Sequence, residues 1–169
     1  MTEREEGSAA YKRILAENHR YTEAFDRSAL TATPLSGLAI LACMDARLNV
    51  EVALGLRTGD AHIIRNAGGL ATDDAIRSLI ISQQVLGTSE VLVIGHTGCG
   101  LLGADEVELR NRLERESGQH VDVDFGSFVD LDDSVRAQVA RLRAHPWIRR
   151  VPVHGLVFEV ESGRLYEIA

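Results

Sequence analysis

Residues 38–48 read Leu-Ala-Ile-Leu-Ala-Cys-Met-Asp-Ala-Arg-Leu. The first seven residues of this stretch are all apolar, which is typical of a strand that is buried on both faces of a sheet. The polar residues Asp45 and Arg47 follow directly. The stretch therefore predicts a strand buried on both faces of a sheet, with chemically useful side chains where it ends.

The sequence on either side alternates between strand and helix patterns. Further strands are expected at residues 61–65 and 90–95, a C-terminal β-hairpin at 156–160 and 165–168, and helices at 8–27, 48–56, 72–86, 104–117 and 127–144. Buried strands that alternate with helices indicate an α/β fold with a mainly parallel central sheet flanked by helices. No repeat or long linker divides the chain, so we expect a single domain over residues 1–169, with residues 1–30 as a helical arm.

Composition excludes several classes of function. The chain has 169 residues and a net charge of -7 without a basic block, which argues against a nucleic-acid partner. No apolar run is long enough to span a membrane, and the charged N-terminus lacks the apolar core of a signal peptide. A cytoplasmic protein is expected, and its two cysteines are then free thiols, metal ligands or nucleophiles rather than a disulfide.

Both cysteines follow strand patterns in short polar segments. Cys43 begins Cys-Met-Asp-Ala-Arg, and Cys99 lies in His-Thr-Gly-Cys-Gly at residues 96–100. In parallel sheets the ligand site lies beyond the carboxyl ends of the strands, where these residues are expected. Two thiolates and the His96 imidazole suit zinc, and three protein ligands with one open position are typical of a catalytic site. Asp45 is the nearby residue that could close that position.

One alternative from the residues alone is a cysteine nucleophile with a histidine partner. That alternative leaves one of the two cysteines, and the pairing of Asp45 with Arg47, without a role. A structural zinc site is disfavoured because it needs four closed ligands.

The motifs C-x-D-x-R at residues 43–47 and H-x-x-C-G at 96–100 are similar to the signature of the β-class carbonic anhydrases. The resemblance extends to Arg-Asn-Ala-Gly-Gly at residues 65–69, to Thr-Asp-Asp at 72–74 and to the C-terminal pattern at 155–165. It covers most of residues 38–168. The chain resembles the small bacterial branch of that family, which also resembles hydrolases of carbonyl sulfide and carbon disulfide.

The resemblance implies zinc-dependent, reversible hydration of carbon dioxide to bicarbonate, in which a zinc-bound hydroxide attacks the substrate. One zinc ion per chain is expected on Cys43, His96 and Cys99. Asp45 is expected to accept a hydrogen bond from the nucleophile, and Arg47 to hold the Asp45 carboxylate away from the metal. Backbone N–H groups at Gly68 and Gly69 are expected to approach the substrate.

Two other functions stay open. The first is hydrolysis of carbonyl sulfide or carbon disulfide at the same zinc site. The second, from a different class, is a zinc- or redox-responsive binding protein whose site is closed by Asp45. The resemblance also implies a homodimer or a larger homo-oligomer, in which the N-terminal arm packs on a partner subunit.

Overall fold

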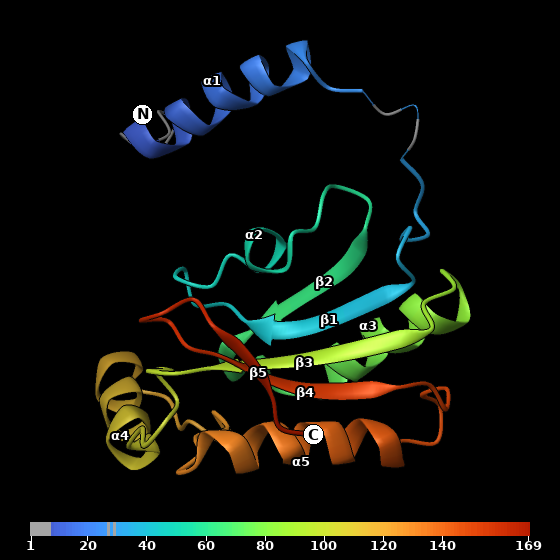
Figure 1. The fold of residues 1–169 in the computed structure, drawn as a ribbon. Coiled ribbons are helices and arrows are strands. Elements are labelled where there is room, and N and C mark those ends of the chain that lie inside the picture. Colours follow the sequence, from blue (N-terminus) through green and yellow to red (C-terminus); the bar gives the residue numbers. More distant parts are fainter. Residues whose placement is uncertain (1–7, 27, 29) are drawn as a thin grey trace. The chain divides into compact units, whose positions relative to one another are not determined.

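The computed structural model describes residues 8–26, 28 and 30–169 (Figure 1). Its contacts divide the chain into two compact units, one that ends at Leu30 and one that runs from Thr31 to Ala169. The interpretation of residues 1–169 as one domain stays a prediction.

The N-terminal unit contains the helix α1, Ala9–Glu23. The Ser8 hydroxyl caps it by accepting a hydrogen bond from the backbone N–H of Tyr11 at 3.2 Å. No residue of α1 is buried. The predicted amphipathic helix is confirmed, although it ends four residues before the predicted boundary at position 27, which itself lies outside the described residues.

The larger unit is built on one five-stranded sheet with the order β2-β1-β3-β4-β5. Its strands are β1 Leu38–Cys43, β2 Ala61–Asn66, β3 Glu90–His96, β4 Val153–Phe158 and β5 Leu165–Glu167. The first four strands along the chain are parallel to their neighbours, and β5 pairs antiparallel to β4. The predicted parallel sheet and C-terminal hairpin are therefore confirmed, and β1 and β3 end side by side.

Helices cover the two faces of this sheet unequally (Figure 1). The helices of the larger unit are α2 Val50–Leu54, α3 Asp73–Gln84, α4 Glu106–Ser117 and α5 Leu131–Ala144, with a 3-10 turn, η1, at Ala67–Gly69. Leu79 of α3 and Val139 of α5 are buried in one core cluster with Leu41 of β1. On the other face, Val50 of α2 packs in a second cluster with Ile40 of β1. Residues 39–43 of the apolar run are thus buried between the two faces, whereas Met44 is exposed.

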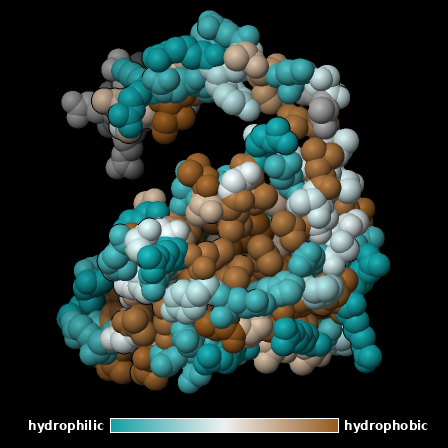
Figure 2. All heavy atoms as spheres, in the orientation of Figure 1, coloured by the Kyte–Doolittle hydropathy of each residue, from teal (hydrophilic) through white to brown (hydrophobic). Residues whose placement is uncertain are grey.

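The second face keeps apolar surface exposed. Leu54, Leu56 and Ile63 are only partly buried against their cluster, and Val52 is 74% exposed. Figure 2 shows hydrophobic side chains gathered over the region of α2 and the neighbouring strands. Among the described residues, no helix is long and apolar enough to cross a membrane.

Two other predicted boundaries differ from the structure by three or four residues. The helix α5 begins at Leu131 and not at residue 127, because the Asp130 carboxylate accepts a hydrogen bond from the N–H of Asp133 at 2.8 Å and caps the helix there. The N–H of Ser127 instead donates to Glu106 of α4 at 2.7 Å. The strand β4 begins at Val153, three residues before the predicted start, because Val153 pairs with Val91 of β3.

Candidate metal centre

The structure brings the three predicted ligands together at the carboxyl ends of β1 and β3. Cys43 is the last residue of β1, His96 is the last residue of β3, and Cys99 follows three residues later. All three side chains are buried, and their donor atoms lie within 4.8 Å of one another. Because zinc lies about 2.3 Å from a thiolate sulfur and about 2.0 Å from an imidazole nitrogen, donors this close can share one ion.

The orientation of His96 fits a metal ligand. Its Nδ1 lies 2.9 Å from the carbonyl oxygen of Thr97, and because a carbonyl can only accept, Nδ1 carries the proton. The other ring nitrogen, Nε2, is buried and has no hydrogen-bond partner among the described residues. Buried polar atoms are normally satisfied, so this nitrogen keeps a lone pair that a metal ion shared with Cys43 and Cys99 could use. A carbonyl on the far ring nitrogen is the usual support of a metal-binding histidine.

The thiols need a cation to become good ligands. Burial raises the pKa of the Cys99 thiol, and the neighbouring Cys43 raises it further. A bound metal ion reverses this preference, because its positive charge favours the thiolate. The donor set of two sulfurs and one nitrogen is suited to zinc.

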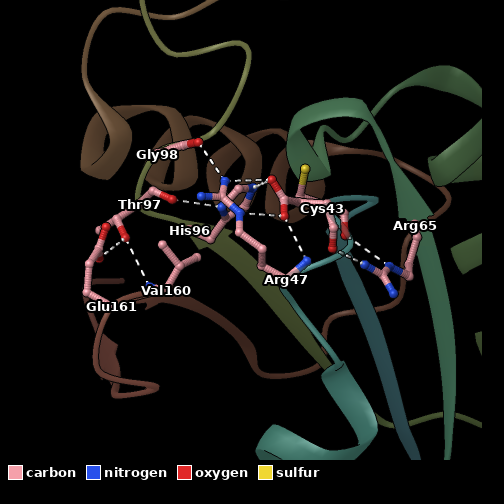
Figure 3. Close-up of polar contacts among 9 residues, drawn as sticks. Cys43, Arg47, Arg65, His96, Thr97, Gly98, Val160 and Glu161 are labelled. Atoms are coloured by element: carbon pink, nitrogen blue, oxygen red, sulfur yellow. Dashed lines mark hydrogen bonds and ion pairs between the residues drawn. The ribbon is translucent and has the colours of Figure 1, made fainter.

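A carboxylate lies beside the three donors. Asp45 Oδ2 is 3.9 Å from His96 Nε2. Arg47 holds this carboxylate by donating from Nε to Oδ1 at 2.9 Å and from Nη2 to Oδ2 at 2.8 Å. These hydrogen bonds are the main cause that lowers the pKa of Asp45, so the carboxyl group is charged. Arg47 Nη2 also donates to the carbonyl of Gly98 at 2.8 Å (Figure 3).

A second arginine clamps the backbone of the same turn. Arg65 of β2 donates from Nε to the carbonyl of Cys43 at 2.9 Å and from Nη2 to the carbonyl of Asp45 at 2.7 Å (Figure 3). These contacts fix the turn on both sides of Met44. The sequence places Arg65 in a motif, but it gives no sign that the side chain would cross to the neighbouring strand.

The predicted glycine pair lies in η1, and both residues have positive φ, 76° at Gly68 and 64° at Gly69. A Cβ atom at Gly69 would lie 3.1 Å from the backbone of Ala42 and Cys43 and 3.2 Å from the carbonyl oxygen of Ile94. Gly69 therefore lets η1 approach the ends of β1 and β3 closely. A role of either glycine in binding substrate stays a prediction.

Sequence reasoning missed the residues that support the ligands. The carbonyls of Thr97 and Gly98 orient His96 and Arg47, and both lie inside the motif without being recognised as functional. Glu161 accepts a hydrogen bond from the Thr97 hydroxyl at 2.9 Å. No sequence pattern relates Glu161 to the motif, because the two residues are 64 positions apart.

Comparison with known proteins identifies relatives with the same architecture. A family model described as carbonic anhydrase matches residues 38–122. β-Carbonic anhydrase 1 of Mycobacterium tuberculosis is 39% identical over 155 residues, which cover 91% of this chain and 94% of that protein. The crystal structure of a carbonic anhydrase from Streptococcus mutans is 40% identical, with a TM-score of 0.91 over 96% of this chain and 99% of that chain.

A relative with another activity is equally similar in the region that it covers. A carbon disulfide hydrolase of Acidithiobacillus thiooxidans is 39% identical over 152 residues, which cover 76% of this chain and 75% of that protein. The family model matches half of the chain, and the relatives named above are 39–40% identical to it. The chain therefore belongs to the β-class carbonic anhydrase family, which has carbon disulfide hydrolases among its relatives.

Proposed function

We propose that this protein catalyses the reversible hydration of carbon dioxide to bicarbonate, with one zinc ion per chain held by Cys43, His96 and Cys99. The observation that carries the proposal is the buried Nε2 of His96, which has no hydrogen-bond partner among the described residues and belongs to a group with two buried cysteines beside an arginine-held carboxylate. Zinc at this position would supply a Lewis acid that brings the pKa of a coordinated water far below that of bulk water.

Asp45 and Arg47 would then act on the attacking water. A charged Asp45 carboxylate can only accept hydrogen bonds, so it orients the water with a lone pair toward the substrate. The Arg47 guanidinium occupies both carboxylate oxygens and keeps Asp45 from becoming a fourth ligand. The N–H groups of Gly68 and Gly69 would approach the substrate from η1.

This arrangement supports the two rival readings less well. A binding protein with a closed site needs Asp45 as a ligand, whereas its oxygens are held by Arg47. A cysteine nucleophile needs an accessible thiolate, whereas Cys43 and Cys99 are 5% and 7% exposed, and burial raises the pKa of Cys99.

Hydrolysis of carbon disulfide or carbonyl sulfide is the second candidate, because a relative of equal identity is a carbon disulfide hydrolase. One zinc-loaded sample should be assayed for carbon dioxide hydration with a stopped-flow pH indicator and for sulfide release from both sulfur compounds. We expect hydration to dominate. Sulfide release without hydration above the buffer rate would replace the first candidate with the second.

We also propose a homodimer, located in the cytoplasm because the two thiol ligands must stay reduced. Apolar side chains of α1, among them Ile14 at 60% and Leu15 at 53% exposed, would cover apolar surface of a second copy. Sedimentation at micromolar concentration should show a dimer that removal of residues 1–30 weakens. If the unmodified protein is a monomer, or if the truncation leaves the dimer unaffected, α1 does not cover a second copy in this way.

A further inference from the structure

The turn between β4 and β5 is attached to the loop that carries the metal ligands. Glu161, in this turn, accepts a hydrogen bond from the Thr97 hydroxyl at 2.9 Å. The same hydroxyl accepts a hydrogen bond from the N–H of Val160 at 3.0 Å. Figure 3 shows Thr97 between Glu161 on one side and His96 and Gly98 on the other. The Thr97 side chain thus bridges the turn to the residues beside the ligands.

The backbone that this side chain holds orients two residues of the site. The carbonyl of Thr97 lies 2.9 Å from His96 Nδ1, and the carbonyl of Gly98 accepts from Arg47 Nη2 at 2.8 Å. The N–H of Thr97 donates to the carbonyl of Phe158 at 3.0 Å. The bond to Glu161 therefore restrains rotation of a loop segment on which both His96 and Arg47 depend.

We propose that Glu161 is a positioning residue for the reaction, acting through the Thr97 hydroxyl on the carbonyls that orient His96 and Arg47. The inference rests on the proposed function and adds a residue from a distant turn to its site. Because Glu161 is exposed, its hydrogen bond contributes little to the stability of the whole protein. Its main effect is on the geometry of the loop after β3.

Glu161 also places negative charge near Arg47. The pKa of Arg47 is raised mainly by its hydrogen bonds to Asp45, with smaller contributions from the charges of Asp45, Glu161 and Cys99. The hydrogen bond and the charge can be separated by substitution. In Glu161→Gln the amide oxygen can still accept from Thr97, whereas the charge is lost; in Glu161→Ala both are lost.

The test compares these two variants with Thr97→Val, Thr97→Ser and the control Glu159→Ala. Glu159 is a carboxylate of the same turn that bonds Ser162 and not Thr97. We expect Glu161→Ala and Thr97→Val each to lower kcat for carbon dioxide hydration about tenfold, the size seen when groups behind metal ligands are removed. Glu161→Gln and Thr97→Ser should recover most of the activity, and Glu159→Ala should match the unmodified protein. The double variant Glu161→Ala/Thr97→Val should be no worse than Thr97→Val alone, because Thr97→Val already removes the hydrogen bond between the two residues.

Two further measurements do not depend on turnover. Zinc affinity in competition with a chelator should weaken about tenfold in Glu161→Ala, and the visible spectrum of the cobalt-substituted protein should change. Unchanged kcat, affinity and spectrum in Glu161→Ala would overturn the proposal, and so would a loss in Glu161→Gln as large as in Glu161→Ala. If the unmodified protein hydrates no carbon dioxide, the proposed function fails, whereas the affinity and spectral comparisons still decide the role of Glu161.

Discussion

Arg47 fixes the Asp45 carboxylate with two parallel hydrogen bonds, from Nε to Oδ1 at 2.9 Å and from Nη2 to Oδ2 at 2.8 Å. The backbone N–H of Arg47 also donates to Oδ1 at 2.9 Å. Because Nη2 additionally donates to the carbonyl of Gly98, the carboxylate is held from the exit of β1 and from the loop after β3 at the same time. Asp45 is thus oriented by the two segments that carry the proposed ligands.

Replacing Arg47 by Lys should impair catalysis although the positive charge remains. An ammonium group cannot make the two parallel bonds, so Asp45 would lose its fixed orientation, and we expect kcat/KM for carbon dioxide to fall at least about tenfold. Stopped-flow hydration measures this. The control is Arg77→Lys, which changes an exposed pair with Asp74 and should leave the rate unchanged. Equal rates in Arg47→Lys and the control would show that the two parallel hydrogen bonds to Asp45 are not needed.

Asp45→Asn should separate metal binding from catalysis. The amide keeps the size of the side chain but carries an N–H₂ group and no charge, so it cannot serve as the same acceptor. We expect full zinc content and a loss of about a hundredfold in hydration rate over about pH 7 to 9. Normal hydration by this variant would remove Asp45 from the mechanism.

Loss of either cysteine ligand should abolish zinc binding. Cys43→Ala and Cys99→Ala each leave two protein donors, and we expect zinc per chain, measured by elemental analysis, to fall to a small fraction. The control is His154→Ala, a histidine that pairs with Glu90 and Glu167 away from the three ligands. Full occupancy in either cysteine variant would contradict the assignment.

Gly69→Ala should destabilise the fold more than Gly118→Ala does. Both glycines have positive φ, 64° and 69°, so both substitutions introduce similar backbone strain. A Cβ atom at Gly69 would meet backbone atoms at 3.1 Å, whereas nothing lies within 4 Å at Gly118. We expect the free energy of unfolding in urea to fall by about 1–3 kcal/mol more for Gly69→Ala than for the control. Equal losses would show that η1 can move away from β1.

Glu106 should make stability depend on pH in the acid range. The N–H of Ser127 is the main cause that lowers the pKa of the Glu106 carboxyl from its ordinary value of 4.5. Since the folded-state pKa is depressed, the stabilisation is fully present above the ordinary value and is lost as pH falls through the lowered one. The difference in unfolding free energy between the unmodified protein and Glu106→Gln should therefore shrink on acidification. Urea unfolding at stepped pH values tests this, with Glu116→Gln at an exposed position of the same helix as the control. A difference that is constant with pH would contradict the prediction.

The sequence alone was enough to predict the parallel sheet and to suggest Cys43, His96 and Cys99 as metal donors. The apolar run at residues 38–44 predicts a strand buried on both faces, and its residues Leu38–Cys43 form β1, which lies between β2 and β3. His96 and Cys99 lie in one loop, and Asp45 and Arg47 in one turn. These relations could be predicted because periodicity and short-range spacing are properties of consecutive residues.

The contacts that support the site could be seen only once the chain was folded. Arg47 reaches the Gly98 carbonyl across 51 positions of the chain, Arg65 crosses from β2 to the turn after β1, and Thr97 bonds Glu161 across 64 positions. The path of the chain before α5 likewise includes a hydrogen bond from Ser127 to Glu106, 21 positions away in α4. Such contacts follow from strand order, register and loop path, which bring distant residues together, and local pattern carries no information about which polar groups then meet.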